Sequence, residues 1–132
     1  MRTLIAITML TSAMLAYPIA ASAQERTEDQ CAALHPDATS PVEMATCTSD
    51  LDGSRKLLNR AYGVLAKELQ GDRLSALEKA QRLWLDYRIA ECQLETGGYP
   101  GSTGYDSGVI SCTADMNRRR AAELEKLAAS FK

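Results

Sequence analysis

Four cysteines limit the folds open to this chain of 132 residues more strongly than any other feature: Cys31, Cys47, Cys92 and Cys112. In an exported chain of this size they predict two disulfides. None lies in a Cys-x-x-Cys motif, so thioredoxin-like redox chemistry has no motif here. Because His35 is the single histidine, a zinc site would need cysteine ligands alone, at spacings unlike those of zinc fingers. We therefore expect a stapled fold without a metal or cofactor, and a surface loop position for His35, which precedes Pro36.

The N-terminal residues have the pattern of an export signal. Arg2 precedes an apolar run over residues 4–16, and Ala-Ser-Ala at 21–23 is a small-x-small cleavage site. The run is too short for a membrane span. There is no cysteine near position 24, so a lipid anchor is not expected. We expect residues 1–23 to be removed as a signal peptide. The remainder, 24–132, is then one periplasmic or secreted domain.

Charge is unevenly distributed along the expected mature chain. Residues 24–53 carry seven acidic residues against Arg26, whereas residues 54–132 carry ten acidic and thirteen basic residues. An acidic face suits a cationic partner, although a solvated helix start produces the same pattern. Consecutive arginines at 118–120 point to three different helix faces, with no aromatic residues between them, so nucleic-acid binding has no support.

Capping signals and apolar spacing predict an all-α fold. A capping box at 27–30 opens a short N-terminal helix, and a second at 40–43 opens the longest helix, about 41–70, which Gly53 could bend. Apolar residues recur at threes and fours along it, and no segment alternates with period two.

Two further main helices complete a predicted bundle of three. Gly71 ends the first and Asp72 caps the second, about 73–95; so short a junction predicts an antiparallel helical hairpin. A third helix, about 109–130, returns antiparallel to the second.

This folding gathers the four cysteines at one end of the bundle. The preferred pairing is Cys31–Cys47 with Cys92–Cys112, because it ties the N-terminal arm and a glycine-rich loop to long helices. A Cys47–Cys92 bond remains open as an alternative.

The segment 80–92 holds the single tryptophan in a mixed polar and apolar stripe. Gln81, Trp84 and Arg88 share one helix face with Glu91, and Arg88 can lie over the indole of Trp84. We expect a structural polar core in which an arginine is held by Glu91 or a backbone carbonyl; a ligand site is the alternative. The bundle register adds three further members to this core: Asn59, Tyr62 and Arg120.

Residues 96–108 are predicted to form a loop with five glycines and one proline. Rigid aromatic and small polar groups of this kind suit a binding surface. The tentative target-contacting residues are Tyr99, Ser102, Tyr105 and Asp106. The alternative interpretation is a plain helix connector, although thirteen residues make a long one.

The residues also resemble a known family. Met44-x-x-Cys47, Leu58-Asn59-x-x-Tyr62, Ala80-Gln81-Arg82-x-Trp84-x-x-Tyr87-Arg88-x-Ala90-Glu91-Cys92, Gly97-Gly98, and Cys112 with Arg120 and Leu124 are similar to the lysozyme inhibitor LprI-like family of exported bacterial proteins. The resemblance covers about 28–127. Two positions depart from the family pattern: Ile89 replaces an acid and Asn117 a threonine.

The resemblance implies a binding protein that inhibits c-type lysozyme, a strongly cationic target that an acidic chain would attract. The alternative is a structural or interaction module of the cell envelope, such as an adaptor or a chaperone-like subunit. An enzyme is not expected: Glu91 with Glu95, or Asp50 with Asp52, could form an acid/base pair, but no nucleophile has a base and no phosphate loop appears. Oligomeric state is not predicted.

Overall fold

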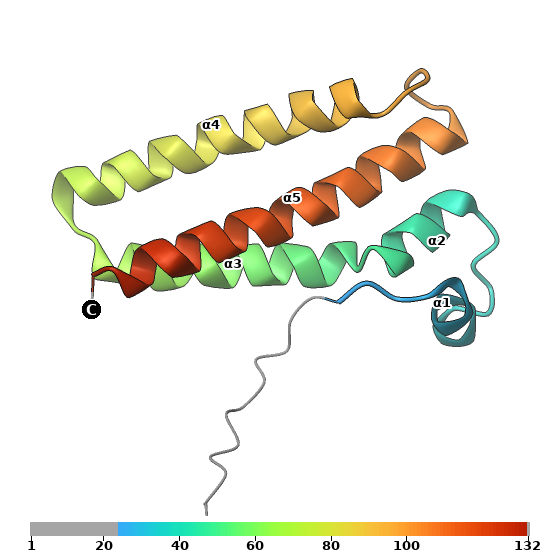
Figure 1. Cartoon of the computed structure of the whole chain (residues 1–132), viewed down its shortest axis with the longest axis horizontal. Helices are drawn as coiled ribbons and strands as arrows, with labels where there is room; N and C mark the ends of the chain where they lie inside the picture. Colours follow the sequence, from blue (N-terminus) through green and yellow to red (C-terminus); the bar gives the residue numbers. More distant parts are fainter. Residues whose placement is uncertain (1–23, 132) are drawn as a thin grey trace, which may run out of the picture.

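The computed structural model describes residues 24–131, so the expected signal peptide at 1–23 lies outside the described residues. The described part is all-α, as predicted, and has five helices: α1 (Glu28–Leu34), α2 (Pro41–Thr48), α3 (Leu51–Glu68), α4 (Gly71–Glu95) and α5 (Thr103–Ala129). α3, α5 and α4 form one layer with α5 in the middle, and α1 and α2 lie at one end of it (Figure 1). Among these residues, no helix is both long and apolar enough to span a membrane.

Both predicted capping boxes form. Thr27 Oγ1 accepts a hydrogen bond from the backbone N–H of Gln30, and Ser40 Oγ accepts one from that of Glu43. The Glu43 carboxylate in turn accepts the backbone N–H groups of Ser40 and Thr39 at 3.2 Å each. These bonds favour the charged carboxylate, so they lower the pKa of Glu43.

The predicted helix 41–70 is broken into α2 and α3, and the break lies before Gly53 rather than at it. Asp50 adopts a left-handed conformation with φ 48°, and its carboxylate folds over Gly53. A Cβ on Gly53 would lie 2.1 Å from Asp50 Oδ2. Gly53 therefore acts by leaving room for the side chain of Asp50, which Arg26 holds by an ion pair of 2.9 Å.

The hairpin of α3 and α4 is antiparallel, but its two helices hardly touch, because α5 lies between them (Figure 1). Small residues explain the close approach of α3 and α5: Ala61, Ala121 and Ala128 are buried in their interface beside Leu65 and Leu124. α4 joins this core mainly through Leu77 near the Leu69–Gln70 connection, which we call the hairpin end.

The loop predicted over 96–108 is shorter than expected, because α5 begins at Thr103 and not near 109. Gly104 and Gly108 lie within the predicted loop, yet both are helical. Gly108 lies against Thr96, where a Cβ would approach Thr96 Cγ2 to 2.6 Å. The glycine thus allows α5 to pass close to the end of α4, a benefit that offsets its poor helix propensity.

Two disulfides join Cys31 to Cys47 and Cys92 to Cys112, so the preferred pairing is confirmed and the Cys47–Cys92 alternative is wrong. Both lie at the end that carries α1, α2 and the loop 96–102, which we call the stapled end. By closing loops of about this length, each contributes roughly 3 kcal/mol to stability.

Two glycines of α3 give a matched test of this account. Gly63→Ala should raise the free energy of unfolding by about 0.5–1 kcal/mol, because nothing lies within 4 Å of the added Cβ. Gly53→Ala should lower it, because the methyl group displaces the Asp50 carboxylate from Arg26. Urea unfolding of both variants measures the difference, and equal stabilisation at the two positions would contradict the role given to Asp50.

Candidate target-binding surface

Only one of the four predicted loop residues projects freely. Tyr99 is 71% exposed, whereas Tyr105 is 9% exposed and belongs to the first turn of α5. Ser102 Oγ donates to the carbonyl of Tyr99 at 2.9 Å, and Asp106 Oδ1 accepts the N–H of Gly101 at 3.3 Å. Tyr105, Ser102 and Asp106 therefore hold the loop in shape, and Tyr99 is its exposed aromatic residue.

The predicted polar core forms around Trp84, in part. The guanidinium groups of Arg88 and Arg120 lie 5.4 and 5.8 Å from the Trp84 ring centroid, and Arg120 Nε donates to Gln81 Oε1 at 3.3 Å. Two cations therefore lie over the indole, which also packs against the edge of the apolar cluster. Arg120 also forms an ion pair of 3.0 Å with Glu123.

Three members of the predicted core lie elsewhere or act differently. Asn59 is exposed and Tyr62 packs at the edge of the apolar cluster. Glu91 does not hold an arginine; it neighbours Tyr87, whose pKa it raises through its negative charge. The expected Glu91 or carbonyl partner is replaced by Asn117, which the sequence marked only as a departure from a family pattern.

Asn117 is fully buried and connects three helices. Arg88 Nη1 donates to Asn117 Oδ1 at 2.6 Å, Asn117 Nδ2 donates to Ser54 Oγ at 3.0 Å, and Ser54 Oγ donates to the carbonyl of Leu51 at 2.7 Å. Burial lowers the pKa of Arg88, and the positive charge of Arg55 lowers it further. The relay therefore gives this half-buried cation of α4 one hydrogen bond, from Nη1, that continues through α5 to α3. Among the described residues, its buried Nε has no hydrogen-bond partner.

Carboxylates collect at the stapled end. Residues 24–53 and 91–115, which make up this end, contain eleven acidic residues and one basic residue, Arg26. The rest of the described chain, 54–90 and 116–131, contains six acidic and twelve basic residues. The molecule is thus strongly polarised, with its negative charge around α1, α2 and the loop 96–102.

Arg26 of this end and Arg118 of the adjoining part of α5 pair with its carboxylates. Arg26 binds Asp50, and Arg118 donates to the carbonyl of Ser49 at 2.7 Å and pairs with Glu25 and Asp115. They join the N-terminal arm to the start of α3 and to α5. Because their charge is compensated internally, they do little to offset the remaining carboxylates.

A hollow of about 560 Å³ opens between the end of α1 and the start of α2. Its lining includes Leu34, an exposed apolar side chain, together with His35, Asp37, Glu43 and Asp52. His35 is exposed here at the C-cap of α1. An apolar residue bordered by carboxylates is a surface that a cationic protein can contact, and periodicity alone did not identify Leu34.

The carboxylates of the two candidate acid/base pairs interact with arginines or with a tyrosine. Asp50 is ion-paired with Arg26 and Asp52 with Arg55, while Glu91 and Glu95 flank the phenol of Tyr87 and raise its pKa. Within residues 24–131, no group of histidine, cysteine and acidic side chains could hold a metal ion.

The relay supplies a stability prediction. Asn117→Ala should lower the free energy of unfolding by about 2–3 kcal/mol, because it strands the Arg88 guanidinium and leaves Ser54 without its donor. Arg119→Ala, an exposed neighbour, should change it by less than about 0.5 kcal/mol. Chemical unfolding compares the two, and similar values would show that the relay contributes little.

The chain is similar to one protein family and to one curated protein. The family model described as Lysozyme inhibitor LprI matches residues 31–124. The uncharacterized protein R02472 of Rhizobium meliloti (strain 1021) is 31% identical over 104 residues, which cover 68% of this chain and 75% of that protein. No solved structure matches the chain. The matched range includes both disulfides, the Trp84 cluster and the loop.

Proposed function

The chain belongs to the lysozyme inhibitor LprI family, and on this premise we propose that it is an exported protein that binds and inhibits a cationic c-type lysozyme. The uneven distribution of charge is the observation that supports a cationic target. Eleven acidic residues against one basic residue at the stapled end attract a cationic protein and orient it toward that end.

The contact surface follows from what this end exposes. Its exposed large apolar side chains are Tyr99, Leu34 and Leu94. Tyr99 lies in the loop and Leu34 in the hollow, both among carboxylates that a lysozyme's arginines and lysines can bind. Aromatic and aliphatic anchors inside a polar rim are the usual centres of binding energy at protein interfaces. Because each disulfide closes one of the two segments, little conformational entropy is lost on binding.

The first test uses the loop anchor. Tyr99→Ala should weaken inhibition of c-type lysozyme at least tenfold, about 1.4 kcal/mol, with unchanged thermal stability because the side chain is exposed. Val64→Ala, an exposed residue of α3 outside the stapled end, is the control.

Muramidase assays across lysozyme classes measure both variants and the parent protein. Equal inhibition by the parent and Tyr99→Ala would assign the contact to the Leu34 hollow instead. If the parent inhibits no lysozyme, the proposed function is wrong, and a cell-envelope interaction module becomes the better proposal.

The second test uses charge. The double variant Asp37→Lys/Asp52→Lys should slow association with lysozyme at least tenfold at low ionic strength, and the difference should shrink as salt screens it. The control is Glu68→Lys/Asp72→Lys at the hairpin end, which changes the net charge by the same amount. Like the first variant, it replaces one acidic residue in the first turn of a helix, Asp72 in α4 and Asp52 in α3. Stopped-flow or surface-plasmon kinetics compare them; identical losses would show that only net charge matters, not its position.

A further inference from the structure

The outer face of α4 carries a row of apolar residues that the fold does not use. Spaced alternately by four and three residues, they form what we call the α4 seam: Ala76, Ala80, Leu83, Tyr87, Ala90 and Leu94. All six are exposed. This spacing is the heptad repeat by which one helix packs along another. The contacts of α4 with the core come from other residues, such as Leu77 and Cys92.

We propose that the α4 seam pairs antiparallel with the α4 seam of a second copy of this chain. A two-fold axis midway between Leu83 and Tyr87 places Leu83 of one copy opposite Tyr87 of the other. The same symmetry places Ala76 opposite Leu94 and Ala80 opposite Ala90. The seam is therefore complementary to itself in size, since the small Ala76 near the hairpin end meets Leu94.

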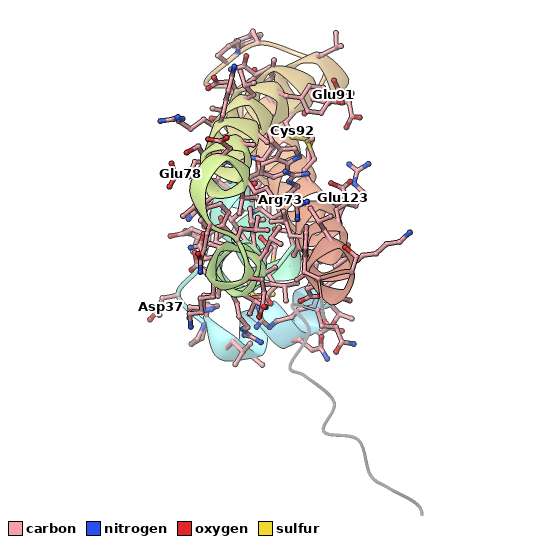
Figure 2. All side chains as sticks on the ribbon, turned by 90° about the vertical axis from the view of Figure 1, so that its left-hand side faces the viewer. Asp37, Arg73, Glu78, Glu91, Cys92 and Glu123 are labelled. Atoms are coloured by element: carbon pink, nitrogen blue, oxygen red, sulfur yellow. A yellow bond between two sulfur atoms is a disulfide. The ribbon has the colours of Figure 1, made fainter. Side chains whose placement is uncertain are left out.

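A groove beside the seam fits Leu94, which at 81% is the most exposed of its large side chains. The groove, of about 710 Å³, runs between α4 and α5 at the hairpin end and is mainly apolar: Ala76, Ala80 and Leu77 line one wall, and Leu124, Leu127 and Phe131 the other. Arg73 and Glu123, both labelled in Figure 2, border it. In the antiparallel register, Leu94 of the second copy arrives at Ala76 and enters this groove.

Charge favours the same orientation. Arg73 follows Asp72 in the first turn of α4, whereas the last two turns carry Glu91 and Glu95 and no basic residue. Arg73 and Glu91 lie five helical turns apart, so their side chains project from the same side of α4. Figure 2 shows Glu91 and Glu78 on opposite sides of this helix. Antiparallel pairing brings Arg73 of each copy toward the acidic end of the other, and it also opposes the two helix dipoles favourably. A parallel pair would align like charges along its whole length.

The first test measures association of the purified protein by sedimentation equilibrium. The parent should dimerise, and Leu83→Glu should raise the dissociation constant at least tenfold. Ile89→Glu is a matched control, because Ile89 is 53% and Leu83 59% exposed on the same helix, but Ile89 lies outside the seam. A parent that stays monomeric, or equal effects of the two substitutions, would overturn the proposal.

The second test fixes the orientation. A benzophenone amino acid at Leu94 should cross-link, on illumination, to residues 73–80 of another copy, mapped by mass spectrometry. Such a link cannot form within one chain, because Leu94 and Ala76 are about 27 Å apart along α4. Cross-links near Leu94 of the other copy would indicate a parallel pair, and cross-links to added lysozyme alone would make the seam a target surface; either result contradicts antiparallel self-pairing.

Discussion

The hydrogen-bond relay from Arg88 through Asn117 and Ser54 to the carbonyl of Leu51 fixes how the three long helices meet. Each group in it has one usable direction: the guanidinium only donates, the amide of Asn117 accepts on one side and donates on the other, and the hydroxyl of Ser54 ends the chain. A half-buried cation without such partners would be costly. The relay thus sets the rotation of α4 about its axis and places Trp84 against both Arg88 and Arg120.

This polar attachment explains why much of the surface of α4 is not covered by the other helices. α3 and α5 share an aliphatic and alanine-rich interface, whereas α4 is held by Leu77 near the hairpin, by the relay in its middle and by the Cys92–Cys112 bond near its end. Three attachments along one face leave the rest of the helix surface open. The exposed residues of the α4 seam are the consequence, since a helix packed against both neighbours would have buried them.

Much of the fold could be predicted from the sequence because it depends on local chemistry. The capping boxes at Thr27 and Ser40 form as expected. Helix length and direction placed the four cysteines at one end, and the pairing that ties two loose segments to long helices is the one that forms. The errors come from tertiary contacts. Asp50 is left-handed where Arg26 and Gly53 accommodate its carboxylate, and α5 begins at Thr103 and passes close to Thr96 at Gly108.

The candidate site was harder to predict for the same reason. Tyr99 and Tyr105 have identical side chains in a glycine-rich segment, yet one is exposed and the other is buried, because the start of α5 decides which of them faces the helices. Asn117 carries no periodic signal, and its role depends on Ser54, which lies 63 residues away in the sequence. The uneven charge of 24–53 was visible in the sequence, but its continuation through 91–115 needed the fold.

The polarised charge also connects the two proposed interfaces. Antiparallel pairing through the α4 seam directs the stapled ends of two copies away from each other, so that α1, α2 and the Leu34 hollow lie at opposite extremes of the pair. Each end keeps its own cluster of carboxylates, and one lysozyme bound at either end would not obstruct the other. The pairing keeps the acidic end of each copy away from that of the other, and two acidic ends side by side would repel each other. A single asymmetry of charge can therefore select both a cationic target and the direction of self-association.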